Sequence, residues 1–69
     1  METFELDDHD YIELNNLLKS MGWVESGGLA KTLISEGYVQ VNGEVETRKR
    51  CKIYRGMEVT FEGQTLVVI

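Results

Sequence analysis

Hydrophobic residues in the first half of the chain follow a helical period. Four of them are spaced at i, i+3, i+4 and i+7, forming one apolar stripe: Leu14, Leu17, Leu18 and Met21. Asp10 and Glu13 form a pair similar to a capping box and predict that this helix begins at Asp10. Gly22 suits the position just past the helix end, with Trp23 folding back on the last turn. The pattern predicts a first helix over residues 10–21.

A second helix is predicted from Ser26, its N-cap, to about Glu36, with Gly37 ending it. Gly27 and Gly28 weaken its first turn. Its expected buried side consists of Leu29, Ala30, Leu33 and Ile34. Because only a few residues join the two helices, they form a compact helical hairpin.

The second half of the chain changes to the period of a strand. Val39 and Val41 alternate with polar residues, and Asn42-Gly43 is a strong hairpin signal. A two-residue turn pairs Val41 with Glu44 and leaves Val45 on the opposite face. Either Val45 packs elsewhere, or the loop carries an extra residue.

Residues 3–6 are predicted as a short first strand, and the apolar stretches 53–54, 59–61 and 66–69 predict two or three further short strands. Together with the hairpin they predict an α+β fold, in which a two-helix hairpin packs on a small, mostly antiparallel sheet of three to five short strands. A chain of 69 residues, 42% of them hydrophobic, is expected to form one domain with one small core.

Composition excludes several classes of function. One cysteine and one histidine provide neither an internal disulfide nor a zinc site, so no metal or other cofactor is expected. No catalytic motif or phosphate-binding glycine loop is present, and His9 is expected to be exposed and idle. The chain is predicted to be a non-enzymatic protein with no small-molecule substrate. Because we find no secretory signal and no apolar run of membrane-spanning length, we expect a cytoplasmic protein without membrane contact. We also expect it to be a monomer.

The net charge of −5 is unevenly distributed. Residues 1–13 carry six acids and no Lys or Arg, whereas one acid-free stretch of eight residues holds five of the seven bases: Arg48, Lys49, Arg50, Lys52 and Arg55. Such a cluster suits the binding of phosphate groups. In the alternative interpretation it is a solvated loop whose charges pair with Glu44, Glu46 or the acidic N-terminus.

Cys51 lies between Arg50 and Lys52. Flanking cations lower the pKa of a thiol when they lie close to the sulfur. The alternative, which we favour, is a small, half-buried strand residue whose neighbours point the other way.

The order of these signals resembles the ribosomal S-four-type RNA-binding domain, or alpha-L motif. The resemblance begins with Ser26-Gly-Gly-Leu-Ala30-Lys31, continues through Gly37-Tyr-Val39-Gln-Val41-Asn42-Gly43, and ends after the basic segment with Arg55-Gly56-Met57-Glu58-Val59. It covers roughly residues 10–60 of a single domain, 1–69. The small size and the run from Glu46 to Ile53 look closest to the stand-alone bacterial YbcJ-like group of such proteins.

The resemblance implies a protein that binds structured RNA, such as ribosomal or transfer RNA, through a basic strand and the second helix. It places these residues on the RNA-contacting face: Lys31, Asn42, Thr47, Arg48, Lys49, Arg50 and Lys52. Arg55 is added as the last base of the basic segment. Recognition is then expected to rest on the phosphate backbone and on RNA shape.

The chain also departs from the family pattern. Gly27 stands where the family usually has Arg, Ser35 replaces a common base, and Met57-Glu58 replaces the usual Gly-Asp portion. The second helix is therefore poorer in bases, which predicts weaker or narrower RNA binding. The rival hypothesis is a protein-interaction adaptor whose basic stretch binds an acidic partner, with Trp23 or Tyr38 as an apolar anchor.

Overall fold

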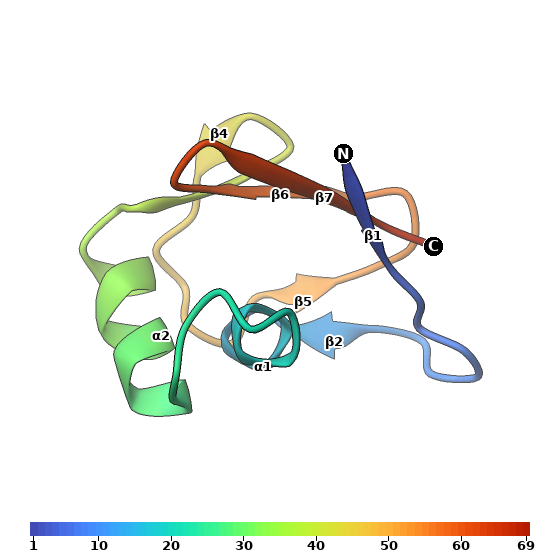
Figure 1. Ribbon diagram of the computed structural model, residues 1–69, viewed down its shortest axis with the longest axis horizontal. Helices are drawn as coiled ribbons and strands as arrows, with labels where there is room; N and C mark the ends of the chain where they lie inside the picture. The colour runs from blue at the N-terminus through green and yellow to red at the C-terminus, as the bar shows by residue number, and fades with distance from the viewer.

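The computed structural model describes all residues from 1 to 69. In chain order the elements are β1 (Glu2–Phe4), β2 (Ile12–Glu13), α1 (Leu14–Ser20), α2 (Gly27–Ser35), β3 (Val39–Val41), β4 (Glu44–Val45), β5 (Lys52–Ile53), β6 (Glu58–Phe61) and β7 (Gln64–Val68). Five strands form a sheet in the order β1-β7-β6-β3-β4, and β2 pairs separately with β5. The five-stranded sheet makes one layer, and α1, α2 and the β2–β5 pair lie on one side of it (Figure 1).

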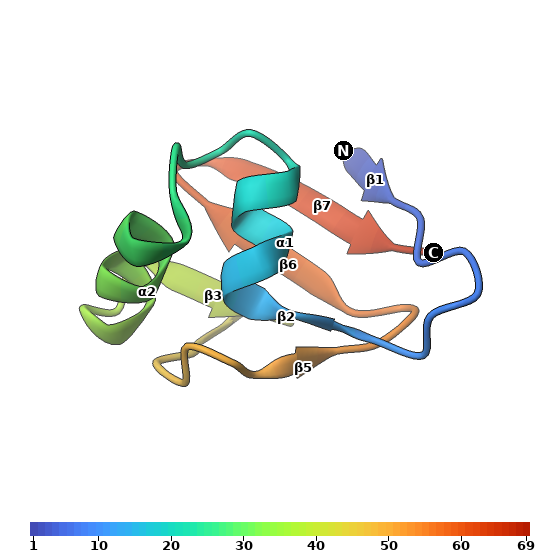
Figure 2. The same ribbon diagram turned by 90° about the horizontal axis from the view of Figure 1, so that it is seen from below.

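The predicted α+β class is confirmed. All pairs in the large sheet are antiparallel except β1–β7, which is parallel. Seen from below, α1 lies across β6 and β7, with α2 beside it (Figure 2). The separate β2–β5 pair was not predicted. It is antiparallel, with Ile12 opposite Ile53 and Glu13 opposite Lys52.

The apolar stripe of α1 faces the core as predicted. Leu14, Leu17 and Leu18 have no exposed surface, and Met21 packs at the edge of the core. The sheet supplies the opposite side of the core through alternate residues of β3, β6 and β7: Val39, Val59, Phe61, Leu66 and Val68. This burial of apolar surface is the main stabilising contribution in so small a domain.

The predicted start of the first helix is wrong. The helix begins at Leu14, Asp10 lies in an exposed bend, and the N-cap residue Glu13 makes no side-chain capping bond. The predicted end is confirmed: Gly22 has φ +74°, and the Trp23 amide donates to the Leu18 carbonyl at 3.1 Å. Trp23 packs at the core edge and stacks on Phe61, with ring centroids 6.5 Å apart.

The second helix agrees with its prediction except on one face. Ser26 caps it by accepting a hydrogen bond from the Leu29 amide at 3.1 Å. Leu29 itself is 45% exposed, whereas Ala30 and Ile34 are fully buried. The buried stripe is centred on these two residues, and Leu29, about 100° before Ala30 around the helix, turns away from it.

The β3–β4 hairpin has a two-residue turn. Val41 pairs with Glu44 and Gln40 with Val45, while Asn42 and Gly43 both have positive φ, as a type I′ turn requires. The alternative with an extra loop residue is thus excluded. Val45 is 58% exposed and passes close to Gly37, where a Cβ would lie 3.6 Å from its methyl group.

The remaining predicted strands are present with shifted ends. The first covers Glu2–Phe4 and stops before Leu6, which is nevertheless buried and donates its amide to the Ile69 carbonyl at 3.0 Å. Neither helix combines the length and the apolar character that crossing a lipid bilayer requires. No three His, Cys, Asp or Glu side chains are placed together as metal ligands.

Candidate nucleic-acid interface

Residues 48–52 of the basic segment are fixed to the start of α1 by backbone hydrogen bonds, and of these only Lys52 lies in a strand, so the expected basic strand is mostly a turn. The Leu14 amide donates to the Cys51 carbonyl at 2.9 Å, and the Asn15 amide donates to the Lys49 carbonyl at 3.1 Å. Two amides that begin a helix without partners are thereby satisfied by this segment instead of by a capping side chain. The cations therefore extend from an anchored backbone.

Arg48 is held in one orientation by Glu46. Its Nε donates to Oε2 of Glu46 at 2.9 Å and its Nη2 to Oε1 at 3.0 Å, and the Arg48 amide also donates to Oε2 at 2.9 Å. The Arg48 side chain nevertheless remains 76% exposed. A guanidinium has five N–H donors. Two of them bond to Glu46 and a third, on Nη2, contacts Sγ of Cys51 at 3.5 Å, so two remain. Arg48 is thus an oriented group with donors left for an external acceptor.

The bonds from Arg48 lower the pKa of Glu46 from 4.5 to about 2. We expect carboxyl NMR to give a Glu46 midpoint near pH 2 in the folded protein, and Arg48→Gln to return it toward 4.5. Because the folded state binds this proton less readily than the unfolded chain, the pair stabilises the fold above pH 4.5, and this contribution is lost as pH falls toward 2. A wild-type midpoint near 4.5 would contradict the bidentate pair.

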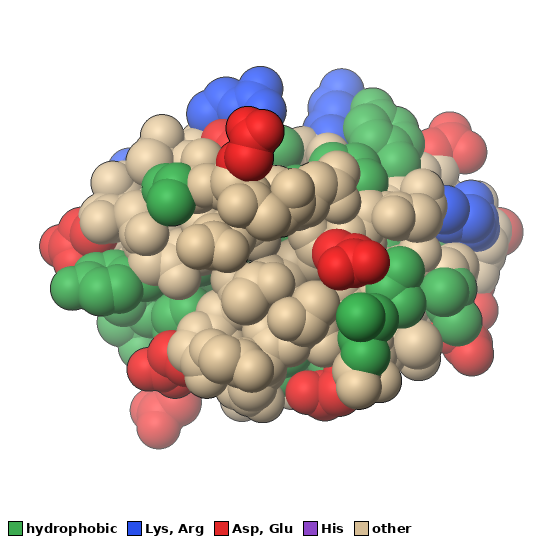
Figure 3. Space-filling view, turned by 90° about the horizontal axis from the view of Figure 1, so that it is seen from above, with side chains coloured by type: hydrophobic (Ala, Val, Ile, Leu, Met, Phe, Trp, Pro, Cys, Tyr) green, Lys and Arg blue, Asp and Glu red, His purple; other side chains and the backbone are tan.

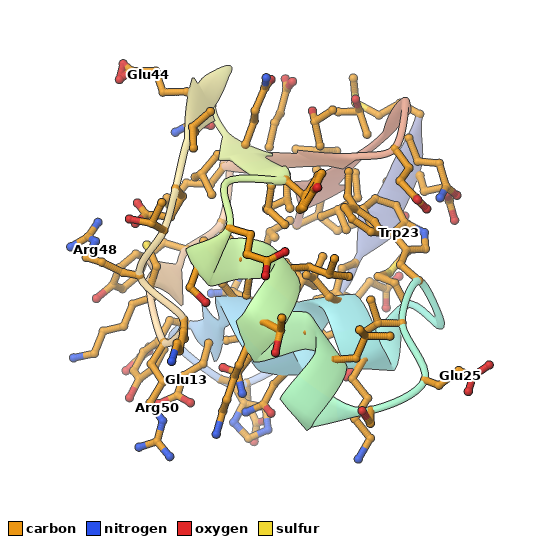
Figure 4. The ribbon with its side chains drawn as sticks, turned by 90° about the vertical axis from the view of Figure 1, so that its left-hand side faces the viewer. Glu13, Trp23, Glu25, Glu44, Arg48 and Arg50 are labelled. Carbon is orange, nitrogen blue, oxygen red and sulfur yellow. The ribbon has the colours of Figure 1, made fainter.

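The other cations of the segment are less constrained. Lys49 is exposed, and Arg50, with a side chain 71% exposed, has its Nε 3.9 Å from Oε1 of Glu13. Arg48 and Arg50 extend from the same side of the molecule, with Glu13 beside Arg50 and Trp23 on the opposite side (Figure 4). In a view onto the large sheet, Lys and Arg side chains project along the upper rim and at the right-hand edge, and acids are scattered over the face and the edges, one of them beside the basic groups of the upper rim (Figure 3).

We call the surface formed by the exposed cations Arg48, Lys49, Arg50 and Lys52 the cationic rim. A hollow of about 560 Å³ at this rim is lined by Arg48, Arg50, Cys51, Lys52 and Tyr54. A second hollow, of about 620 Å³, is lined mainly by residues 4–13, which include several acids. The charge asymmetry of the sequence is therefore also an asymmetry in space. Anionic ligands are favoured at the first hollow and opposed at the second.

Cys51 is structural. Its side chain is buried, and burial together with the nearby Glu46 carboxylate raises the pKa of the thiol, although Arg48 acts in the other direction. The favoured interpretation of a small, inward-facing residue is confirmed, but Cys51 directly precedes β5 instead of lying in it. The neighbouring cations do not make it a reactive thiolate.

The structure places the other predicted site residues in different surroundings. Lys31 lies on α2, and Thr47 is exposed next to the basic segment. Asn42 binds β6 at two points: its amide donates to the Glu58 carbonyl at 2.8 Å, and its Oδ1 accepts from the Glu58 amide at 2.9 Å. Arg55 donates to the Asp7 carbonyl, which joins its loop to the N-terminal segment.

Both interpretations of the basic segment therefore describe part of it. The paired-charge alternative holds for Arg48 with Glu46 and, at longer range, for Arg50 with Glu13, whereas no ion pair involves Glu44. The phosphate-binding interpretation is supported by the exposure that these cations keep.

Sequence reasoning missed two tyrosines beside the cations. Tyr11 and Tyr54 lie next to the β2–β5 pair with their ring centroids 5.8 Å apart, and Lys52 Nζ is 4.9 Å from the Tyr11 centroid. The available signal was a tyrosine next to an isoleucine in each of the two segments, at Tyr11-Ile12 and Ile53-Tyr54. The pairing of these distant segments was not predicted, so the tyrosines were not connected.

Comparison with known proteins identifies the class to which this arrangement belongs. The family model described as "S4 domain" matches residues 4–69, so the chain belongs to the S4 domain family. The predicted resemblance is thereby confirmed.

Individual relatives narrow the comparison. The chain is 54% identical to the Escherichia coli K12 protein named "Putative RNA-binding protein YbcJ", over 100% of this chain and 99% of that protein. It is 41% identical over 56 residues to "Probable ribosome maturation protein RlbA" of Bacillus subtilis 168, covering 81% of this chain and 79% of that one. The solution structure of the E. coli YbcJ protein, described as an alpha-L motif involved in RNA binding, matches with a TM-score of 0.76 over 100% of this chain and 87% of that one.

Proposed function

We propose that this protein is a non-catalytic RNA-binding module that docks on structured RNA through residues 48–52. The observation that carries the proposal is the anchored and exposed group of cations: Arg48, Lys49, Arg50 and Lys52. Family membership supports it, since relatives are named for RNA binding and ribosome maturation. Structured ribosomal or transfer RNA is the expected target.

The mechanism follows from the geometry of the rim. The Glu46 carboxylate orients Arg48 for donation to phosphate oxygens, while the flexible Lys49 and Lys52 act as point charges. In an A-form helix the deep groove hides the base edges, so these contacts read the backbone and the shape of the RNA.

α2 adds a surface that suits close approach to RNA. Its residues 27–35 contain no acid and one base, Lys31. A Cβ at Gly27 or Gly28 would meet no atom closer than 3.9 Å, so neither glycine is required by packing within the protein. We infer that α2 lies along the RNA beside the cationic rim. In this arrangement Asn42 and Arg55 support the turn and the loop, and Thr47 lies at the margin of the contact.

Salt dependence tests the proposal. With about four phosphates neutralised, the plot of log K against log salt for an RNA hairpin is expected to have a slope of about −3. The measurement is fluorescence anisotropy of labelled ribosomal and transfer RNA fragments over a range of KCl concentrations. Absorbance at 260 nm that copurifies with the protein and disappears after ribonuclease treatment would provide independent support. Absence of binding to ribosomal, transfer and total RNA would overturn the proposal in favour of an adaptor for an acidic protein.

A further inference from the structure

The β2–β5 pair exposes two aromatic side chains on its outer face. Side chains alternate along a strand, so Tyr11 and Tyr54 face away from Ile12 and Ile53, which lie opposite each other in the register. Ile53 is fully buried, whereas Tyr11 is 39% exposed and Tyr54 47% exposed. Their rings are inclined at 51° with centroids 5.8 Å apart. The two tyrosines therefore form a surface pair that is not part of the hydrophobic core.

The surroundings of the two rings differ. Tyr54 lines the same hollow as Arg48, Arg50 and Lys52, while Tyr11 lines the hollow formed by the acidic N-terminal segment. A phosphate chain is attracted to the Tyr54 side and repelled from the Tyr11 side. Tyr54 is thus the ring available to a ligand that also binds the cations, and Tyr11 packs against it at a tilt of 51°.

The backbone of Tyr54 is held in place. Its amide contacts Sδ of Met57 at 3.1 Å, and its carbonyl accepts from the Met57 amide at 3.1 Å. Lys52 Nζ lies 4.9 Å from the centroid of the Tyr11 ring, so this cation is also next to the tyrosine pair. An ordered ring bordered by cations combines the two elements with which proteins bind unpaired nucleotides, namely a stacking surface and phosphate contacts.

We propose that Tyr54, supported by Tyr11 and flanked by Arg50 and Lys52, is a stacking site for an unpaired RNA base. This inference rests on the proposed RNA-binding function and adds a substrate class to it. The bases of a continuous duplex are stacked on one another and cannot reach the ring. The preferred RNA is therefore a helix with a bulge, loop or single-stranded end next to it, with the phosphates of the helix on the cationic rim.

Two RNA probes separate this inference from the proposed function. The first is a blunt RNA duplex, and the second is the same duplex with a single-stranded adenosine overhang. Wild-type protein is expected to bind the second more tightly by roughly 5- to 100-fold, the range for one stacked base. Tyr54→Leu is expected to lose this preference while keeping its affinity for the blunt duplex, and Tyr54→Phe is expected to retain the preference.

Tyr38 provides a matched control because it is also exposed, at 61%, and lies outside the hollow that Tyr54 lines. Tyr38→Leu is expected to leave both affinities unchanged, and thermal unfolding checks that every variant is folded. Equal binding of the two RNAs by wild type, or a preference that survives Tyr54→Leu, would overturn the stacking site alone. Absence of binding to either RNA would overturn the proposed function together with it.

Discussion

Replacing Lys49 and Arg50 with glutamate is expected to weaken binding to structured RNA on the order of 100-fold at ~0.1 M salt. Neither side chain is tightly bound within the protein: Lys49 forms no ion pair, and Arg50 has only a 3.9 Å contact with Glu13. The double substitution therefore removes two phosphate contacts and places two repulsive charges at the same point. Anisotropy titrations should show the loss together with a salt slope that is shallower by about 1.4 to 1.8.

A matched control distinguishes a local contact from a general effect of net charge. Lys19→Glu changes the net charge as much as Arg50→Glu, but Lys19 lies in the last turn of α1, whereas the basic segment is bonded to the first. Along the helix axis these sites are roughly 7 Å apart, close to the screening distance of about 8–10 Å at ordinary salt. Arg50→Glu is expected to weaken binding by about 10-fold and Lys19→Glu by less than about 2-fold. Equal losses would mean that the rim is not the contact.

Local signals predicted most of the fold because they depend on residues close in sequence. The ends of both helices are set by Gly22 and Gly37, and the β3–β4 turn by Asn42-Gly43, all with positive φ. Such conformations favour Gly and Asn whatever the rest of the chain does. The leucine stripe of α1 likewise needs only an apolar surface to pack against.

The errors arise where distant segments meet. Asp10 is a good capping residue by type, but the first α1 amides bond to the carbonyls of Lys49 and Cys51, more than 30 residues away in sequence. This contact makes a local cap unnecessary and allows Ile12 and Glu13 to pair as β2. A strand of two residues has no periodicity to detect, so β2 and its pairing with β5 were not predictable from the sequence.

The residues of the candidate site were likewise predictable from the sequence, but their contacts with distant segments were not. The sequence located the cations of residues 48–52, but it did not decide which of them bind acids and which remain open. Glu46 is two residues from Arg48, so their pairing was a foreseeable alternative, whereas the approach of Glu13 to Arg50 follows from the β2–β5 pairing. The contact between Tyr11 and Tyr54 also follows from the β2–β5 pairing. Composition thus predicts the chemistry of this surface, and long-range pairing gives its geometry.

The same pairing predicts that Ile53→Ala strongly destabilises the domain. Ile53 is fully buried beneath the outward-facing Lys52 and Tyr54. Loss of a buried Ile side chain costs about 2–5 kcal/mol, and a domain of this size has about 3–10 kcal/mol in total. At roughly 4–8 °C per kcal/mol, the midpoint of thermal unfolding should fall by about 10 °C or more.

Val45→Ala is the matched control, because it also shortens an aliphatic residue in a two-residue strand, but at a position 58% exposed. Its effect is expected to stay within about 0.5 kcal/mol. Circular dichroism melts of both variants compare the two sites directly. If Ile53→Ala melts within about 2 °C of wild type, β5 is not anchored in the core and the rim is not preorganised. If Ile53→Ala melts as expected, its RNA affinity at a temperature below the unfolding midpoint tests whether Ile53 also positions Lys52, its neighbour in β5.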